Sequence, residues 1–321
     1  MTTPPATRDP DSQALVERYL AHVRVHKRLA ERTQVLYALD LQKLQALAAE
    51  DGVPILQVHP HHVRRWVAQM HARGRSGRGI ALILSGWRGL YAWLGREGLM
   101  AINPVVDVRA PKAPKPLPKA LGVDEAVQLA AFENEEASPD LEARDQCVVE
   151  LLYGCGLRLG ELEGLDALAS SQARGWVDLE AGEAHVLGKG GKRRSVPVGG
   201  PALKALRAWL EVRQAWLSAA PEPSAALFIG RRGQRLSPRQ LRARLRQRSL
   251  QTGLATPVHP HMLRHSFASH VLQSSGDLRA VQELLGHAHI STTQVYTRLD
   301  FQHLAKVYDA AHPRAQRPGK K

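Results

Sequence analysis

The sequence predicts a mainly α-helical protein in two parts, with one small antiparallel sheet in the second part. Apolar residues recur at helical spacing through both halves of the 321-residue chain, and an extended pattern is confined to a short stretch after its middle. The halves are separated by residues 103–119, which contain five prolines and four basic side chains. Proline fixes φ and biases the preceding residue toward extended geometry, so this segment is expected to be a stiff connector. A spacer role and a contact with a charged partner both stay open for it.

Four helices are expected before the connector, over residues 12–27, 31–49, around 63–70 and 79–97. Ser12 is a suitable N-cap for the first. A basic loop, Arg73-Gly-Arg75-Ser-Gly-Arg78, joins the last two. The residues expected to face the core of this bundle are Leu15, Tyr19, Leu20, Val23, Val35, Leu36, Leu39, Leu44, Leu47, Val63, Trp66, Val67, Met70, Ile80, Ile83, Leu84, Trp87, Leu90, Tyr91 and Leu94.

The second half begins with two expected helices within residues 123–164 and then changes period. Three short β-like runs follow, at 176–179, 184–187 and 195–198. Residues 188–194, GKGGKRR, are expected to form the hairpin turn between the last two runs. Helical patterns return from Pro201 and persist to the end. This order predicts an α-rich domain with a three-stranded antiparallel sheet.

Helix start signals are clear in the last third of the chain. Ser237 and Ser291 are each followed three residues later by Gln, the pattern of a capping box. Asp277 is placed to cap a helix over 278–285, and Gly286 supplies a left-handed stop for that helix.

The charge balance points to a polyanionic partner. Lys and Arg number 44 against 30 acidic residues, which gives a net charge of +14. This favours nucleic acid first and an anionic membrane second. The longest uncharged apolar stretch, between Arg78 and Arg88, is far shorter than the roughly 20 residues of a membrane span. With no secretion signal and only Cys147 and Cys155, too few for a disulfide framework or a zinc cage, we expect a cytoplasmic protein.

The densest positive segment is residues 231–248, which contains eight arginines and no acidic residue. Guanidinium forks suit phosphates and guanine edges, and a merely solvated helix usually mixes both signs of charge. We therefore expect a nucleic-acid contact on the helix that Ser237 caps, where arginines three or four apart share one face. The expected contacts are Arg235, Arg239, Arg242 and Arg246 on that helix and Arg73, Arg75 and Arg78 in the basic loop.

Four histidines fall within twelve residues, at His259, His261, His265 and His270. His261 and His265 are four apart, a spacing at which two rings can share one metal ion. No Glu, Asp or Cys in that segment completes such a site, and Arg264 on the same face would repel a cation. The pattern favours an anion-binding His–Arg pair over a metal site, and capping or core roles for some of the histidines stay open.

Three further motifs are weak when each is taken alone. Arg158 lies among glycines in Gly154-Cys-Gly-Leu-Arg-Leu-Gly, where the backbone can approach a ligand closely. Lys189 lies between two glycines of the expected hairpin turn, where most lysines are solvated. Tyr296 follows His287 by nine positions and lies near a helix start, where a tyrosine is most often a packing residue.

Taken in order, however, these residues resemble the tyrosine site-specific recombinases, the lambda-integrase family. The ordered set is Arg158, Lys189, His261-x-x-Arg264, His287 and Tyr296. The resemblance covers nearly the whole chain, and the tail from Ser266 to Arg314 is most similar to the bacterial XerC branch. It implies a SAM-like core-binding bundle over residues 1–106, a basic linker over 107–119 and a catalytic domain over 120–321.

The resemblance also implies how this set would cut and rejoin DNA. Tyr296 matches the nucleophile that forms a 3′-phosphotyrosine bond, and Arg158 and Arg264 match the two arginines that clamp the scissile phosphate. Lys189 matches the general acid for the leaving 5′-oxygen, and its neighbour Lys192 is the alternative.

Three more residues receive supporting roles from the same resemblance. His261 matches a residue that assists proton transfer from the tyrosine, and His287 matches a donor to the phosphate. Glu161 matches an acidic residue that supports the site. No metal and no nucleotide cofactor are expected, and the sequence has no Gly-x4-Gly-Lys-Ser/Thr loop.

The XerC-like tail implies a role in resolving chromosome dimers at cell division. The implied partners are double-stranded DNA with a specific site, a sister recombinase of the XerD type in a heterotetramer, and a cell-division DNA translocase. The alternatives are an XerD-type recombinase, a phage or integron integrase, a type IB topoisomerase and a DNA-binding protein that keeps only the fold.

The chain beyond Tyr296 has apolar residues at helical spacing, namely Phe301, Leu304, Val307 and Tyr308. Such a terminal helix can fold back on its own domain or dock on another molecule. Strand exchange needs coupled active sites, and the resemblance implies that this segment provides the coupling by docking on a neighbouring protomer.

Overall fold

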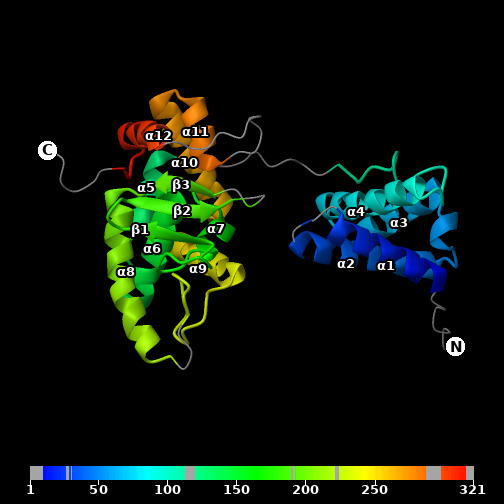
Figure 1. Ribbon diagram of the computed structural model, residues 1–321, viewed down its shortest axis with the longest axis horizontal. Coiled ribbons are helices and arrows are strands. Elements are labelled where there is room, and N and C mark those ends of the chain that lie inside the picture. The colour runs from blue at the N-terminus through cyan, green and yellow to red at the C-terminus, as the bar shows by residue number, and fades with distance from the viewer. Residues whose placement is uncertain are drawn as a thin grey trace. The chain divides into compact units, whose positions relative to one another are not determined.

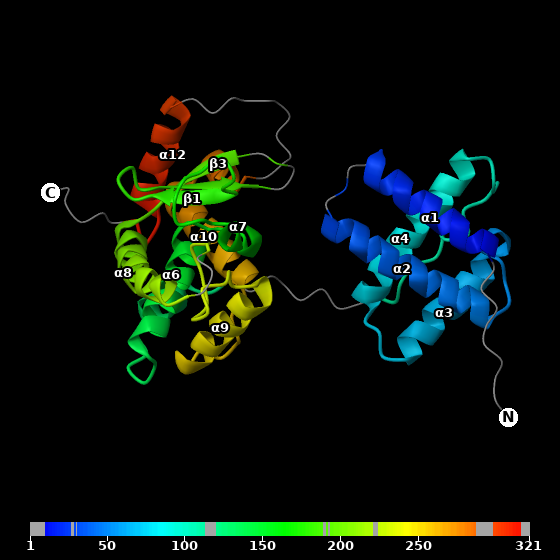
Figure 2. The same ribbon diagram turned by 60° about the horizontal axis from the view of Figure 1, so that its bottom comes forward.

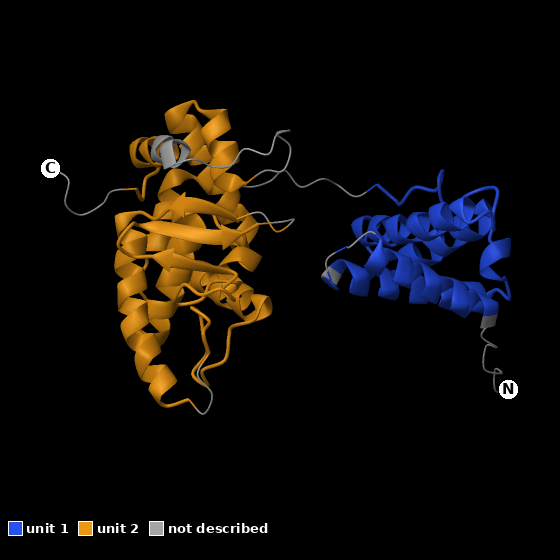
Figure 3. Ribbon diagram, in the orientation of Figure 1, with its two compact units in different colours: residues 1–115 blue, residues 116–321 orange. Residues whose placement is uncertain are grey.

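The computed structural model describes residues 10–26, 29, 31–112, 120–188, 191, 193–220, 224–286 and 298–315. Within them, twelve α-helices and three strands form the elements labelled in Figure 1. The chain divides into two compact units, Met1–Lys115 and Pro116–Lys321 (Figure 3). The predicted fold class, mainly helical with one small sheet, is confirmed. No helix in the described ranges is both long enough and apolar enough to cross a membrane.

The first unit is the expected four-helix bundle. Its helices are α1 (Pro10–Val25), α2 (Glu31–Glu50), α3 (Pro60–Ala72) and α4 (Gly77–Arg96), with a short 3-10 turn η1 (Ile55–Gln57) before α3. Figure 2 shows α1 and α2 side by side. Trp66 and Trp87 are fully buried and meet edge to face, with ring centroids 6.0 Å apart. Trp87 also donates a hydrogen bond from Nε1 to the carbonyl of Asp40 at 2.7 Å, which ties α4 to α2.

Helix α4 begins two residues earlier than expected. Ser76 is its N-cap, and the Ser76 hydroxyl accepts a hydrogen bond from the amide of Gly79 at 3.2 Å. Arg78 therefore lies on the first turn of α4, whereas Arg73 and Arg75 lie between the two helices.

Helix α2 buries only part of the face that was expected. Val35, Leu36 and Leu39 were expected in the core, but they are 54%, 51% and 55% exposed. Leu44 and Leu47 are buried as expected, and the buried stripe continues through Leu41, which was not expected and lies out of phase with Leu39. The prediction was made from the positions of the most apolar residues. In the structure, contacts with α1 and α4 decide which face of the helix is buried.

The first half of the proline-rich connector belongs to the first unit. Val105 and Val108 are buried in the core of the bundle. Arg88 of α4 donates to the carbonyls of both residues, from Nε at 3.1 Å and from an Nη at 2.9 Å. The remainder of the connector, residues 113–119, lies outside the described residues.

The second unit packs helices around a three-stranded antiparallel sheet of order β1-β2-β3. The strands are β1 (Gly175–Asp178), β2 (Glu183–Leu187) and β3 (Arg193–Pro197), within two residues of the expected runs. The helices are α5 (Val123–Ala131), α6 (Pro139–Gly154), α7 (Leu159–Glu163), α8 (Gly200–Ser218), α9 (Pro238–Gln251), α10 (Pro260–Ser275), α11 (Leu278–Leu285) and α12 (Arg298–Ala311). Residues 123–164 thus hold three helices and not the expected two.

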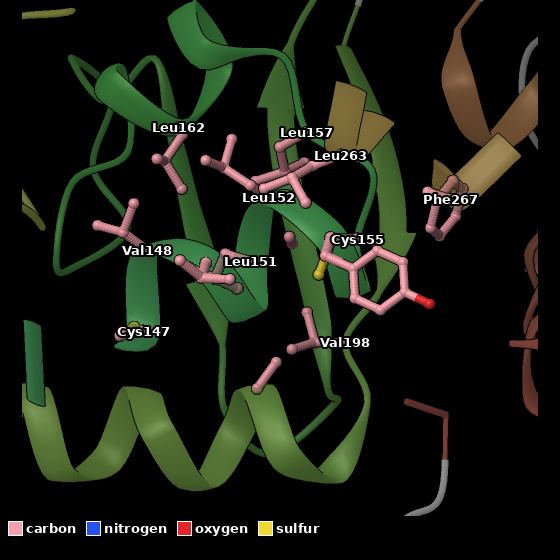
Figure 4. Close-up of a cluster of buried hydrophobic side chains, with 14 of the residues drawn as sticks. Cys147, Val148, Leu151, Leu152, Cys155, Leu157, Leu162, Val198, Leu263 and Phe267 are labelled. Carbon is pink, nitrogen blue, oxygen red and sulfur yellow. The ribbon is translucent and has the colours of Figure 1, made fainter. Parts of the chain in front are cut away.

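Helix α6 runs through the centre of this unit. Figure 4 shows Leu151 and Leu152 of α6 in the core, with Leu157, Val198 and Leu263 from neighbouring segments close by. Cys147 and Cys155 are both buried and free.

The predicted helix caps of this unit are present where the structure describes them. The hydroxyl of Ser237 accepts from the amide of Gln240 at 3.3 Å, and the side chain of Gln240 accepts from the amide of Ser237 at 2.9 Å. Asp277 accepts from the amide of Ala280 at 2.8 Å, and Gly286 ends α11 with φ +63°. Ser291 lies outside the described residues.

The described part of the C-terminal segment folds back on its own unit. Leu304 and Tyr308 of α12 are buried, and α12 packs against α10. The ring of His312 lies 5.2 Å from that of Tyr308, and Arg314 pairs with the buried Glu150. The expectation that Leu304 and Tyr308 dock on a neighbouring protomer is therefore wrong, because these side chains complete the core of their own domain.

We expect Tyr308→Ala to lower the free energy of unfolding of the second unit by about 3–5 kcal/mol, because it deletes a fully buried ring. Calorimetry or urea unfolding would measure this loss. Lys306→Ala is the control on an exposed position of the same helix, and its effect should stay within about 0.5 kcal/mol. A loss below about 1 kcal/mol for Tyr308→Ala would contradict the packing of α12.

Candidate functional site

Arg158 begins the site as the N-cap of α7. Its backbone amide donates to one carboxylate oxygen of Glu161 and its guanidinium donates to the other, both at 2.8 Å. Gly156 just before it has φ +58°, and a Cβ at that position would lie 2.6 Å from the ring of Phe267. The glycine is thus required for close packing on Phe267, and this packing fixes the approach of the chain to Arg158.

Arg264 enters the same site from the first turns of α10. One Nη donates to the carbonyl of Gly156 at 2.6 Å, the other donates to the carbonyl of Leu285, and the side chain is 9% exposed. Burial, followed by the charge of Arg158, lowers the pKa of Arg264 to about 9. Arg264 therefore still carries its positive charge at neutral pH.

A third arginine, Arg194 of β3, was missed by the sequence reasoning. Its two Nη atoms donate to the two carboxylate oxygens of Glu161 at 2.6 and 2.9 Å, and its Nε donates to the carbonyl of Leu284 at 3.0 Å. What identifies it is the sheet itself: Arg194 pairs with Val186 on β2 and shares the inward face of β3 with Val196. An arginine at an inward strand position must find a buried partner.

Glu161 is the centre of this group, which we call the arginine cluster: Arg158, Arg194, Arg264 and Glu161. Burial would raise the pKa of the Glu161 carboxyl, but hydrogen bonds from Arg194 and Arg158 outweigh it and hold that pKa below its ordinary value. Three guanidiniums and one carboxylate leave a net charge of 3 − 1 = +2. A partly buried group with this charge and these planar donors is suited to a phosphate.

The C-terminal end of α11 closes the cluster. Its last carbonyls, which have no partner within a helix, accept from one arginine each. Leu284 accepts from Arg194, Leu285 from Arg264, and Gly286 from Arg158 at 3.3 Å. The three cations also complement the negative end of the helix. His287 follows Gly286 directly in the chain, so the cluster fixes the point at which that segment begins.

The four histidines of the α10 region have different surroundings. His259 is the N-cap of α10, and its ring accepts from the amide of Met262 at 3.3 Å. His270 is buried between the hydroxyl of Tyr153 and the carbonyl of Leu121, at 2.9 and 3.0 Å. Capping and core roles are therefore confirmed for these two.

His261 is different, because it is exposed on the first turn of α10, one turn before Arg264. Partial desolvation, followed by the charges of His259, His265, Arg264 and Arg242, lowers its pKa below the ordinary 6.5. Its ring is thus neutral at neutral pH and can accept a proton. Among the residues that the structure describes, no group of three His, Cys, Asp or Glu side chains is arranged to hold a metal ion.

Helix α9 presents two kinds of arginine. Arg239, Arg242 and Arg246 are exposed and have no acidic partner within the described part of the chain. Arg244 and Arg248, on the opposite face, pair with Asp145 and Glu142 of α6 at 2.5 and 2.6 Å. The first three are free for an anionic partner, and the last two hold the helix in place.

The sequence analysis expected Arg235 on the helix that Ser237 caps, but Arg235 does not lie on α9. It precedes the N-cap Ser237, pairs with Asp166 and donates to the carbonyls of Glu163 and Leu165 at 2.6 and 3.0 Å. Its guanidinium is therefore already engaged within the domain. In the first unit, Arg73, Arg75 and Arg78 are all exposed, as expected for the basic loop.

Three of the expected site residues, Lys189, His287 and Tyr296, lie outside the described residues, as does Lys192. Described elements precede and follow each of these residues in the chain. Strands β2 and β3 flank the hairpin that carries Lys189, and residues 287–297 join α11 to α12.

Family models match nearly the whole chain. The Phage integrase family model matches residues 119–303, and the model described as Phage integrase, N-terminal SAM-like domain matches residues 16–98. Tyrosine recombinase XerC 1 of Ralstonia nicotianae is 52% identical over 331 residues, which cover 98% of this chain and 99% of that protein. Tyrosine recombinase XerC of Pseudomonas aeruginosa is 48% identical over 308 residues, which cover 96% and 97% of the two chains.

Solved structures share the fold. A XerH site-specific recombinase bound to a palindromic difH substrate aligns with a TM-score of 0.63 at 20% identity, covering 96% of this chain and 90% of that one. The Tn1549 transposon integrase in complex with a circular intermediate DNA aligns with a TM-score of 0.64 at 16% identity, covering 91% and 98%. At these identities the likeness is one of fold.

We expect Glu161→Gln to destabilise the second unit by roughly 3–5 kcal/mol at neutral pH, because it leaves buried guanidiniums without their counter-charge. The carboxylate has a lowered pKa, so its contribution is present above pH 4.5 and is lost as the pH falls through the folded-state pKa. Urea unfolding of both proteins over a pH series would measure the difference.

The control for this measurement is Glu163→Gln on the same helix. Glu163 pairs with Arg174, which is 52% exposed, so this change should cost less than about 1 kcal/mol. Equal losses for the two variants, or a Glu161 effect that does not diminish in acid, would contradict the ionised, buried state assigned to Glu161.

Proposed function

Since the chain belongs to the phage integrase family and is a tyrosine recombinase of the XerC type, we propose that its arginine cluster holds the scissile phosphate of a DNA site while Tyr296 attacks it. The observation that carries this proposal is the net charge of +2 around Glu161, formed by planar donors from three separate segments. The end of α11 joins that cluster directly to the segment that carries His287 and Tyr296.

The proposed reaction is a transesterification. The phenolic oxygen of Tyr296 forms a bond to phosphorus as the bond from phosphorus to the 5′-oxygen breaks, which leaves a 3′-phosphotyrosine link. A phenol with a pKa near 10 is a poor nucleophile at neutral pH, so its proton must be accepted. His261, whose lowered pKa keeps it neutral, is the proposed acceptor. Lys189 would give a proton to the 5′-oxygen, which is a poor leaving group without one.

The arginines supply the electrostatic part of catalysis. Negative charge grows on the non-bridging oxygens as the phosphorus becomes five-coordinate, and guanidiniums fixed in advance stabilise that charge without reorganising. Magnesium ions perform this task in kinases, and side chains perform it here. The phosphotyrosine bond conserves the energy of the phosphodiester, so the rejoining step requires no nucleotide.

The proposed DNA path runs over α9 to this site. Helix α9 contacts α7, whose N-cap is Arg158, and Arg242 on α9 is exposed. Arg239 and Arg246 continue the same face. Phosphates that follow the scissile one are the proposed partners of these arginines. In the first unit, Arg73, Arg75 and Arg78 are proposed to contact the same DNA.

We further propose that the biological reaction is resolution of chromosome dimers at cell division. A sister recombinase of the XerD type would supply the other active sites of a heterotetramer on the DNA, and a DNA translocase of the division machinery would regulate it. The support is the identity of about half of all residues to XerC proteins along the whole chain. Such a reaction takes place in the cytoplasm, at the nucleoid.

We expect Tyr296→Phe to abolish the covalent protein–DNA adduct while leaving DNA affinity unchanged, because it removes only the nucleophilic oxygen. Nicked duplexes that carry candidate chromosomal recombination sites would trap the adduct, which is detected after denaturation. Tyr308→Phe is the matched control and should keep the adduct, since Tyr308 is buried in the core. Adduct formation by Tyr296→Phe would refute the assignment, and relaxation of plasmids without site preference would favour a topoisomerase.

We expect the double variant Arg239→Gln, Arg246→Gln to bind its DNA site more weakly and with a smaller salt dependence. Each arginine that no longer neutralises a phosphate should reduce the slope of log K against log salt by about 0.9. Titrations at several salt concentrations would measure the slope. The control pair Lys204→Gln, Arg207→Gln removes two exposed cations from α8 and should leave the slope unchanged. Equal slopes for wild type and the α9 variant would show that this face does not contact DNA.

A further inference from the structure

The proposed function assigns the phosphate to the arginine cluster as a whole and gives direct phosphate contacts to Arg158 and Arg264 only, which leaves the part played by Arg194 to be assigned. Resting on that function, we infer that Arg194 is a positioning residue for strand cleavage, which acts through Glu161 and through the end of α11. By its bonds to these two elements it holds the two phosphate-binding arginines in a fixed geometry.

Within the described part of the chain, the side-chain hydrogen bonds of Arg194 go to groups that also hold the other two arginines. Both Nη atoms bond to the Glu161 carboxylate, at 2.6 and 2.9 Å, and the same two oxygens receive the guanidinium and the amide of Arg158. Its Nε bonds to the carbonyl of Leu284, one residue before the carbonyl that accepts from Arg264. One planar fork therefore orients both supports of the phosphate-binding pair.

The net charge of the arginine cluster gives a second reason to assign a positioning role to Arg194. In the intact cluster Glu161 is shared among three cations, and a net +2 remains for the substrate. Without Arg194 the net charge of the cluster would fall to +1. The whole Glu161 carboxylate would then be available to Arg158 and to Arg264, whose Nη lies 3.8 Å from a carboxylate oxygen in the intact cluster. The carboxylate would then compete with the phosphate for the guanidiniums that must bind it.

The surroundings of Arg194 fix its position closely. Its side chain is 6% exposed, and it faces inward from β3 opposite Val186. A Cβ added at Gly286 would lie 3.0 Å from the Cδ of Arg194, so the end of α11 packs directly on its side chain. A shift of this arginine is thus transmitted to the residue that immediately precedes His287.

Another buried arginine shows what a purely structural ion pair looks like in the same unit. Arg248 is 3% exposed, pairs with Glu142 at 2.6 Å and donates to the carbonyl of Phe132. Neither partner contacts the arginine cluster in the described part of the chain. Arg248 therefore resembles Arg194 in burial and in pairing with one carboxylate and one carbonyl, although its Nε has no hydrogen-bond partner among the described residues. What its partners hold is different, because they do not support the phosphate-binding arginines.

The test compares single-turnover cleavage by the full chain for Arg194→Gln, Arg194→Lys and Arg248→Gln. The probe is a nicked duplex that carries the site wild type selects from a randomised pool. Affinity for the intact duplex and thermal unfolding are measured alongside, and rates are taken well below each unfolding temperature. We expect Arg194→Gln to slow cleavage about 10²-fold, as a small misplacement of reacting groups does. Duplex affinity should change less than about threefold, since most DNA contacts lie outside the cluster.

The two other variants separate positioning from charge and from stability. Arg194→Lys keeps the charge but not the fork, and it should remain at least about tenfold slow. Arg248→Gln should lose stability to a similar degree. Because Arg248 anchors α9, its cleavage rate is measured at protein concentrations that saturate the duplex, where it should stay within about twofold of wild type, since its partners hold nothing in the cluster. That split between cleavage rate and stability is not expected of a merely structural arginine.

Three results would overturn the inference. They are wild-type cleavage by Arg194→Gln, full recovery by Arg194→Lys, and an equal slowing by Arg248→Gln. Failure of the proposed function would be a different result, because wild type itself would then form no covalent adduct.

Discussion

The ion pairs of Glu161 are the constraint on which the rest of the second unit depends. Removing three guanidiniums from water in one place is unfavourable unless each finds a charged or strongly polar partner. One carboxylate and three successive carbonyls at the end of α11 meet that need. Residues at positions 158, 194, 264 and 284–286 are thereby held together, and the sheet, α10 and α11 must be arranged around them. The excess positive charge left over is the feature that suits a phosphodiester.

Arg158, Arg264 and Glu161 could be assigned from the sequence, because each lies in a short motif whose order along the chain is distinctive. Arg194 could not be assigned in the same way. It is one of four basic residues in the hairpin GKGGKRR, and nothing in composition separates it from Arg193 beside it. Only the pairing register makes one of the two inward and the other exposed, and its carboxylate partner is 33 residues away. A property set by contacts distant in sequence is not visible in a local motif.

The secondary-structure elements show the same difference between features set by neighbouring residues and features set by distant contacts. The caps at Ser237 and Asp277 were predictable, since a cap depends on residues three positions apart. The buried face of α2 was not, because contacts with α1 and α4 choose its phase and leave Val35, Leu36 and Leu39 outside. Arg235 has the right spacing for the α9 face but lies before the N-cap, where the helical period no longer applies. Spacing predicts a shared face only within the limits of one element.

The folded-back tail bears on how the proposed nucleophile, Tyr296, is positioned. Tyr296 comes two residues before α12, which is anchored by the buried side chains of Leu304 and Tyr308. On the other side, His287 follows the α11 end that the arginine cluster holds. The described elements on both sides of the connecting segment, α11 and α12, are therefore fixed to the core of the same unit. In the proposed reaction we therefore expect coupling to a second protomer to leave α12 in place, since displacing α12 would expose the buried side chains of Leu304 and Tyr308.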